Sequence, residues 1–174
     1  MKVEVLNLEW TSSPSRDREA ATLVCNYLRY QGVSVCEGSI FNGYSLIDNL
    51  NPKIIFMTNT TGSSLSQRVS RYGKSKGAKI ITSFSEGYLK ESYLKEMVWG
   101  HNYDKTIFED LIMSWSNYSF EMVIRSYPKL KNKMVVSGSV AADKSAVFFN
   151  RQKKKKIVVG IGCWGFDIFI DPKK

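Results

Sequence analysis

The sequence has few of the residues that build metal sites and disulfide frameworks. Its 174 residues include one histidine, His101, and three cysteines, Cys25, Cys36 and Cys163, which form no CxxC pair. A structural zinc site needs about four nitrogen or sulfur ligands, and a disulfide framework needs cysteines in pairs. We therefore expect no metal and no bound cofactor, and the sparse cysteines favour a reducing, cytoplasmic location.

Long apolar runs are also missing. No stretch approaches the roughly 20 apolar residues that cross a bilayer, and the first residues lack the apolar block of a secretory signal. Hydrophobic residues make up 43% of the chain and aromatic residues 13%, which excludes a disordered or fibrous protein. The length predicts one domain with the beginning of a second.

Positive charge is in excess, with 25 Lys and Arg against 16 Asp and Glu and a formal net charge of +9. The densest run is NRQKKKK at 150–156. We interpret 149–156 as a basic linker between domains, and the alternatives are contact with an anionic inner membrane or with nucleic acid. No aromatic RNA-binding strand, recognition helix or zinc finger accompanies the lysines, so specific nucleic-acid readout is not expected.

Apolar runs of strand length alternate with helical patterns along the first 140 residues. The strand-like runs are 3–8, 33–36, 54–58, 78–84, 111–115 and 134–137, and the helical patterns are 20–31, 44–50, 65–76, 88–98 and 120–127. Such alternation predicts βαβ units, a parallel sheet and right-handed crossovers. We predict an α/β domain with a Rossmann-like, doubly wound parallel sheet over 1–148. The strand-like run that follows the linker makes 157–174 the start of a truncated second domain.

Small and polar residues follow several of the predicted strands. In open parallel sheets ligands bind beyond the carboxyl ends of the strands, so these loops predict a cleft. Any one of them could equally be an ordinary turn. The candidate substrate-binding residues are Ser12, Ser13, Asn59, Thr60, Ser85, Gly87, Gly138 and Ser139.

Glu86 is the candidate catalytic residue, because it follows the fourth predicted strand between Ser85 and Gly87. A carboxylate there could take a proton from an acceptor hydroxyl or bind sugar hydroxyls. The alternative is an acid in the first turn of the next helix. The GIGCWG sequence at 160–165 matches a dinucleotide fingerprint but lacks the helix and the later acid that such a site needs, so no NAD site is predicted.

Four short motifs occur in a characteristic order: Glu86–Gly87, IMSWS at 112–116, Tyr127–Pro128 and VVSGSVAAD at 135–143. This order resembles the N-terminal half of bacterial surface-carbohydrate (polysaccharide) biosynthesis proteins, which are glycosyltransferases of the GT-B architecture. In that family the motifs are a Glu–Gly pair, a strand ending in Trp–Gly, Tyr–Pro, and a strand leading to Gly–Asn–Pro–Arg–Phe–Asp. This chain departs at Ser116, in place of Gly, and at 139–141, in place of Asn–Pro–Arg.

The resemblance implies the N-terminal, acceptor-side domain of a glycosyltransferase in surface polysaccharide synthesis. Its ligands would be a glycan acceptor and, with a second domain that grips the donor, a nucleotide sugar. Without that second domain we expect negligible activity. The alternatives are a non-catalytic α/β module that pairs with itself or with a separate C-terminal domain, and a basic nucleic-acid-binding protein.

Overall fold

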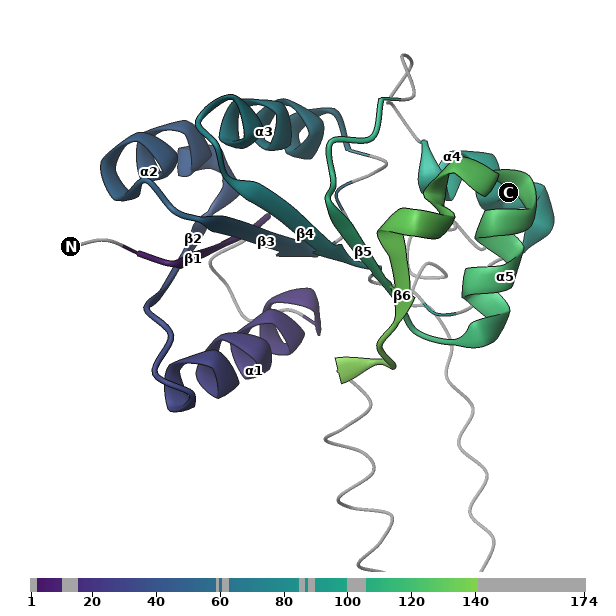
Figure 1. The fold of residues 1–174 in the computed structure, drawn as a ribbon, viewed down its shortest axis with the longest axis horizontal. Helices are drawn as coiled ribbons and strands as arrows, with labels where there is room; N and C mark the ends of the chain where they lie inside the picture. Colours follow the sequence, from purple (N-terminus) through teal and green to yellow (C-terminus); the bar gives the residue numbers. More distant parts are fainter. Residues whose placement is uncertain are drawn as a thin grey trace, which may run out of the picture.

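The computed structural model describes residues 3–10, 16–58, 60, 63–84, 87, 90–99 and 106–140. The strands are β1 (Val5–Glu9), β2 (Val35–Ser39), β3 (Ile54–Thr58), β4 (Lys79–Ser83), β5 (Leu111–Ser114) and β6 (Met134–Val136). The helices are α1 (Arg16–Tyr30), α2 (Gly43–Leu50), α3 (Ser64–Ser75), α4 (Leu94–Val98) and α5 (Asn117–Ser126), with short 3-10 turns η1 (Ile40–Asn42), η2 (Glu91–Tyr93) and η3 (Pro128–Lys133) (Figure 1).

The six strands form one parallel sheet in the order β2-β1-β3-β4-β5-β6. All six predicted strands and the doubly wound α/β fold are therefore confirmed, with small shifts at the strand ends. The strand order reverses at β1 and β3, which is the switch point where doubly wound proteins bind ligands. The predicted linker 149–156 and the segment 157–174 lie outside the described residues.

The two faces of the sheet are covered differently. The connection from β1 to β2 runs toward one edge, and every later connection runs toward the other edge. Right-handed crossovers therefore place α1 on one face and the other helices on the opposite face. Figure 1 shows α1 below the sheet, with α2 and α3 above it.

The core lies mainly on the face opposite α1. One cluster joins β1, β3 and β4 to α2 and α3, with Leu6, Ile55 and Ile80 fully buried. A second cluster joins β5 and β6 to α4 and α5 around Ile112 and Val123. Ser116 caps α5 in a reciprocal capping box with Ser119, which fixes this helix directly after β5.

Candidate functional site

A hollow of about 120 Å³ lies on the α1 face, at the carboxyl ends of β3–β6. The first half of α1 forms one wall, and the strand ends with the segment 137–140 form the other. Its lining is mostly apolar with a few polar groups, as in typical ligand sites. The lining residues are Asp17, Ala20, Ala21, Val24, Phe56, Thr58, Ser83, Phe84, Met113, Trp115, Ser137, Gly138, Ser139 and Val140.

The size of the hollow limits what it can hold. An engineered cavity of about 150 Å³ admits one benzene ring, whereas pockets for drug-sized ligands run from about 300 to 1,000 Å³. The hollow therefore suits one ring-sized group and is too small for a dinucleotide. Among the described residues, the Ser139 Oγ that lines it is buried without a hydrogen-bond partner. A ligand hydroxyl at that position would supply the missing partner.

Behind the wall of the hollow lies Glu9, the last residue of β1, with only 3% of its surface exposed. Its Oε1 accepts hydrogen bonds from Asn7 Nδ2 at 2.9 Å and from the Thr58 backbone N–H at 3.1 Å. Its Oε2 accepts the Thr58 hydroxyl at 2.5 Å. Because Thr58 itself lines the hollow, one hydrogen bond separates this carboxyl group from any ligand there.

Burial raises the pKa of Glu9 from 4.5 to about 7, even though hydrogen bonds from Thr58 and Asn7 favour the ionised form. The nearby Asp17 charge raises this pKa further. A carboxyl group with a pKa near neutrality exchanges protons readily at physiological pH, which is the property of a general acid or base. Perturbed acids of this kind next to a pocket are typical of functional sites.

The structure divides the predicted substrate-binding residues. Gly138 and Ser139 line the hollow, and Gly138 adopts a positive φ of 81° that turns the chain after β6 toward α1. Thr60 does not line it, because this residue is fully buried and its hydroxyl donates to Glu109 instead. Other predicted residues lie outside the described part of the chain: Ser12, Ser13, Asn59, Ser85 and the catalytic candidate Glu86.

Gly87 contributes to the site through Trp115, which lines the hollow. A Cβ atom at position 87 would lie 2.1 Å from Trp115 Cε3, well inside contact distance. The indole cannot retreat easily, because its Nε1 donates to the Phe84 carbonyl at 2.6 Å. The absence of a side chain at Gly87 therefore sets where the indole lies.

We expect Gly87→Ala to destabilise the fold by about 1–3 kcal/mol, because the added methyl group displaces a packed indole. Urea unfolding followed by tryptophan fluorescence measures this cost. The same substitution in a Trp115→Phe background should cost clearly less, since the clashing ring is gone. Equal costs in the two backgrounds would contradict this contact.

A second buried acid, Glu109, lies just before β5 and contacts Gln67 of α3. It is fully buried, and its Oε1 accepts the Thr60 hydroxyl and the Gln67 Nε2, the latter at 3.5 Å. Burial raises the pKa of Glu109, so its neutral form is favoured. Among the described residues its Oε2 has no hydrogen-bond partner.

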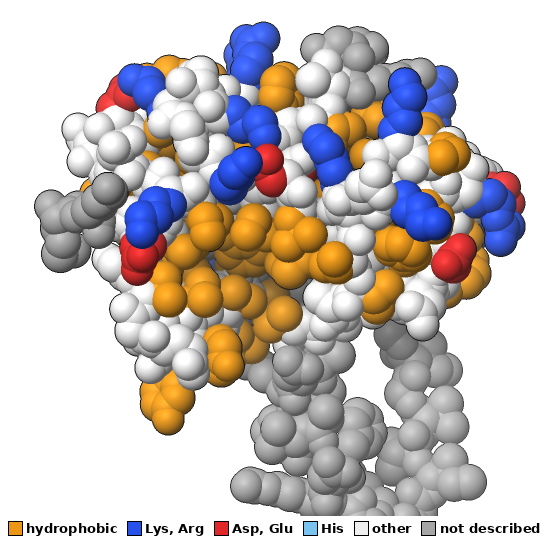
Figure 2. All heavy atoms as spheres, viewed as in Figure 1, with side chains coloured by type: hydrophobic (Ala, Val, Ile, Leu, Met, Phe, Trp, Pro, Cys, Tyr) orange, Lys and Arg blue, Asp and Glu red, His pale blue; other side chains and the backbone are white. Residues whose placement is uncertain are grey.

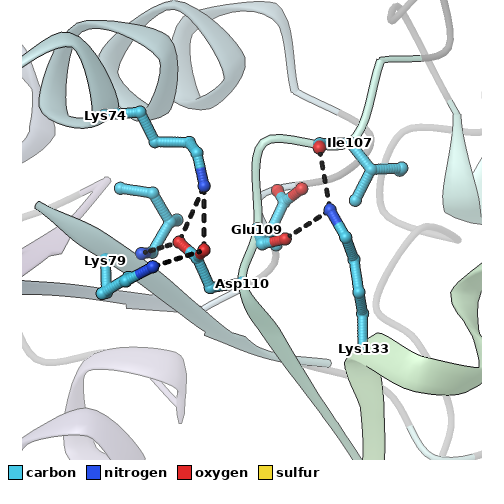
Figure 3. A network of polar contacts seen from close by, with 7 residues as sticks. Lys74, Lys79, Ile107, Glu109, Asp110 and Lys133 are labelled. Carbon is cyan, nitrogen blue, oxygen red and sulfur yellow. Dashed lines mark hydrogen bonds and ion pairs between the residues drawn. The ribbon is translucent and has the colours of Figure 1, made fainter. Parts of the chain in front are cut away.

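The chain around Glu109 is held from both sides (Figure 3). Lys133 Nζ donates to the carbonyl oxygens of Ile107 at 3.2 Å and Glu109 at 2.9 Å. On the other side, Asp110 accepts from Lys74 Nζ at 2.9 Å and from the Ile80 backbone N–H at 2.9 Å. Because both flanks are fixed and Glu109 does not line the hollow, we interpret this acid as structural.

Sequence reasoning missed Glu9, Thr58 and Trp115 as residues of the site. A signal for Glu9 is present, because Asn7 and Glu9 are the polar members of an otherwise apolar strand and fall two residues apart, on one face. In the described part of the chain no helix is long and apolar enough to cross a membrane. The same residues hold no cluster of three or more metal-ligating side chains.

Comparisons with known proteins do not identify the family. No protein-family model matches the sequence, and no curated protein matches it. One similar solved structure is the Vibrio vulnificus NanR protein complexed with ManNAc-6P, with 8% sequence identity and a TM-score of 0.38. The match covers 88% of this chain and only 58% of the NanR chain. Similarity at this level carries no argument about function.

Proposed function

We propose that this domain is the N-terminal, acceptor-side half of a glycosyltransferase in surface polysaccharide synthesis. In this proposal one sugar ring of the glycan acceptor occupies the hollow at the carboxyl ends of β3–β6. A second domain supplies the nucleotide-sugar donor across the opening. The observation that carries the proposal is the Glu9 carboxyl group, with its pKa of about 7, one hydrogen bond behind a ring-sized hollow.

The lining of the hollow suits a sugar ring. A pyranose presents apolar C–H faces and a rim of hydroxyl groups, and the hollow offers Phe84 and Trp115 beside the hydroxyls of Thr58 and Ser139. The aromatic rings supply apolar contact area, while the hydroxyls fix the orientation of the ligand. The volume supports one ring and leaves no space for the donor nucleotide.

The Thr58–Glu9 pair supplies a path for the proton that leaves the acceptor. As the acceptor oxygen bonds to the anomeric carbon of the donor, the bond from that carbon to the phosphate oxygen breaks, and the nucleotide leaves with the electron pair. The acceptor proton passes to Thr58 Oγ1, whose own proton moves to Glu9 Oε2 along the existing hydrogen bond. Glu86, the base predicted from the sequence, lies outside the described residues, so its role stays a prediction.

We expect acceptor-type monosaccharides to bind the 174-residue chain weakly, and Thr58→Val to weaken binding about tenfold. The substitution preserves shape but removes the hydroxyl that contacts the acceptor in this proposal, and one lost hydrogen bond is worth about 1.5 kcal/mol. Saturation-transfer NMR with a panel of hexoses, N-acetylhexosamines and nucleotide sugars measures the binding.

Thr22→Val is the matched control, because its hydroxyl donates to Glu37 Oε2 at 2.9 Å, away from the hollow. Binding by this control should equal that of the wild type. No saccharide binding, or equal losses in both variants, would contradict the proposal. Nucleotide sugars should bind no better than their free sugars, because the donor site belongs to the second domain.

A further inference from the structure

Two large aromatic side chains are exposed where β1 and β2 end. Trp10 follows β1 directly, and Phe41 lies in η1, two residues after β2. Their exposed fractions are 44% and 65%, although rings of this size are usually buried in folded proteins. The ring centroids lie 5.7 Å apart, and the ring planes are nearly perpendicular, at 87°. We call Trp10 and Phe41 the aromatic corner.

The shape of the aromatic corner suits a sugar ring. Two perpendicular aromatic planes can contact a ligand ring on its face and along its rim, and each plane supplies apolar contact area. Asn42 follows Phe41 on the surface, and its side chain makes no capping hydrogen bond to α2. This amide can therefore bond a ligand hydroxyl as donor or acceptor. Apolar faces and a hydroxyl rim are the features that a pyranose presents.

The aromatic corner begins close to the hollow. In the register of β1 and β3, Asn7 lies opposite Phe56. Two residues further along, Glu9 accepts the Thr58 hydroxyl across the same two strands, and Trp10 is the next residue of the chain. Neighbouring strands lie about 4.8 Å apart and consecutive residues about 3.3 Å apart, so the Cα atoms of Trp10 and Thr58 are about 6 Å apart. Because Thr58 lines the hollow, one ligand of two or three rings can contact both places.

The hollow and the aromatic corner lie on opposite sides of one edge of the sheet. The hollow is on the α1 side, whereas η1 leads directly into α2, and Ile40 of η1 packs in the core cluster under α2 and α3. A ligand that reaches both crosses the carboxyl ends of β1 and β3, where the strand order reverses. Doubly wound sheets bind their ligands in the crevice at this switch point.

The charges around these surfaces favour a neutral ligand. No Lys or Arg is among the described residues that line the hollow. Figure 2 shows an apolar patch between the sheet and α1, with the Lys and Arg side chains of this view around it and none inside it. Residues 30–52, which include Phe41, contain two acids and no Lys or Arg, in a chain with a net charge of +9. These described residues therefore offer no cation to an acidic sugar or to an anionic lipid.

We propose that the acceptor is a neutral oligosaccharide, with one ring in the hollow and a following ring on the aromatic corner. This inference rests on the proposed function and adds the length and the charge of the acceptor. A following ring gains stacking contact that a monosaccharide in the hollow does not make, so a trisaccharide should bind about tenfold more tightly than its monosaccharide. Trp10 and Phe41 supply this gain and take no part in the proton transfer.

NMR titration of the ¹⁵N-labelled 174-residue chain tests the inference. The ligands are maltotriose, cellotriose and tri-N-acetylchitotriose, each beside its own monosaccharide, and trigalacturonic acid as an acidic trisaccharide. At least one neutral trisaccharide should bind about tenfold more tightly than its monosaccharide and should shift the Trp10 indole N–H together with the amides of 137–140. Trigalacturonic acid should show no such gain.

Substitutions separate the corner from the hollow. Trp10→Ala and Phe41→Ala should each lower trisaccharide affinity to about that of the monosaccharide and leave monosaccharide binding unchanged. Trp10→Phe should keep most of the gain, and it keeps the test decisive if Trp10→Ala does not fold. Tyr30→Ala is the matched control, because it removes an aromatic ring that is 86% exposed at the end of α1, and it should behave like the wild type.

The outcomes distinguish this inference from the proposed function. Monosaccharides that shift the amides of 137–140, without a tighter trisaccharide or with a gain that survives in Trp10→Ala and Phe41→Ala, would overturn the inference alone. No shift of these amides with any saccharide would contradict the proposed function, and the inference would fall with it. Binding to phosphatidylglycerol vesicles that Trp10→Ala abolishes, without a trisaccharide gain, would make the corner a membrane contact and would overturn the inference as well.

Discussion

The free energy of unfolding should fall by about 2.5 kcal/mol between pH 5 and 8 on account of Glu9 alone. Burial raises its pKa from 4.5 to about 7 in the folded protein, so between these values the native state binds a proton that the unfolded chain has released. A raised folded-state pKa stabilises the protein below the unfolded value, and that stabilisation is lost as the pH rises through 7. Urea unfolding at pH 5, 6, 7 and 8 measures the change.

Glu9→Gln should remove this part of the pH dependence while preserving the contacts. The Gln Oε1 can accept from Asn7 Nδ2 and from the Thr58 N–H, and its Nε2 can donate to Thr58 Oγ1, as a protonated carboxyl group would. A smaller decrease should remain, because burial also raises the pKa of Glu109.

Glu4→Gln is the control for this titration. Glu4 is exposed, and its hydrogen bond from Lys53 lowers its pKa. Its contribution to the free energy of unfolding is therefore lost only as the pH falls below the range tested. The control should keep the full wild-type decrease between pH 5 and 8. An unchanged decrease in Glu9→Gln would show that Glu9 is ionised throughout, and would remove the basis for its role as a proton acceptor.

Truncation of the second buried acid should have a comparably large effect. Glu109→Ala leaves the Thr60 hydroxyl without its acceptor in a fully buried position and opens a cavity, which together should cost about 3–5 kcal/mol. Glu109→Gln retains the Oε1 acceptor and the volume, and should cost less than about 1.5 kcal/mol. Chemical denaturation of the two variants measures the difference.

Glu121→Ala on the exposed side of α5 controls for the loss of a carboxylate, and should change stability by no more than about 0.5 kcal/mol. Equal costs for Glu109→Ala and Glu109→Gln would indicate that the charge, and not the buried contacts, matters at this position. That result would contradict the structural role assigned to Glu109.

The elements of the fold were predictable because each carries a local pattern. Near-continuous apolar runs such as 54–58 predict a buried strand, and the stripe that includes Val24 and Leu28 predicts α1. The strand order was not predictable, since it depends on which strands pair at long range. The unequal cover of the two faces of the sheet was equally hidden, because Ile80 and Ile81 are identical in type, yet Ile80 is fully buried and Ile81 only partly buried.

The site could be predicted only in part, because only some of its residues follow a local pattern in the sequence. The rule that ligands bind beyond strand ends pointed to the edge of the sheet where Gly138 and Ser139 line the hollow. The rule could not distinguish Thr58 from Thr60. Side chains alternate between the two faces of the sheet only as far as the end of β3 at Thr58. Thr60 lies beyond that end, and its hydroxyl donates to Glu109. The rule also passed over Glu9, whose chemistry arises from burial and from a contact with Thr58, 49 positions away in the sequence.

Chemical-shift mapping tests the central claim, sugar binding in the hollow, most directly. An acceptor-type monosaccharide is titrated into the ¹⁵N-labelled chain, and every backbone amide is followed. Saturable shifts should concentrate at Thr58, Ser83, Trp115 and the amides of 137–140, which surround the hollow. Saturable shifts that leave these amides unchanged and cluster elsewhere, or no saturable shift with any sugar tested, would contradict the account.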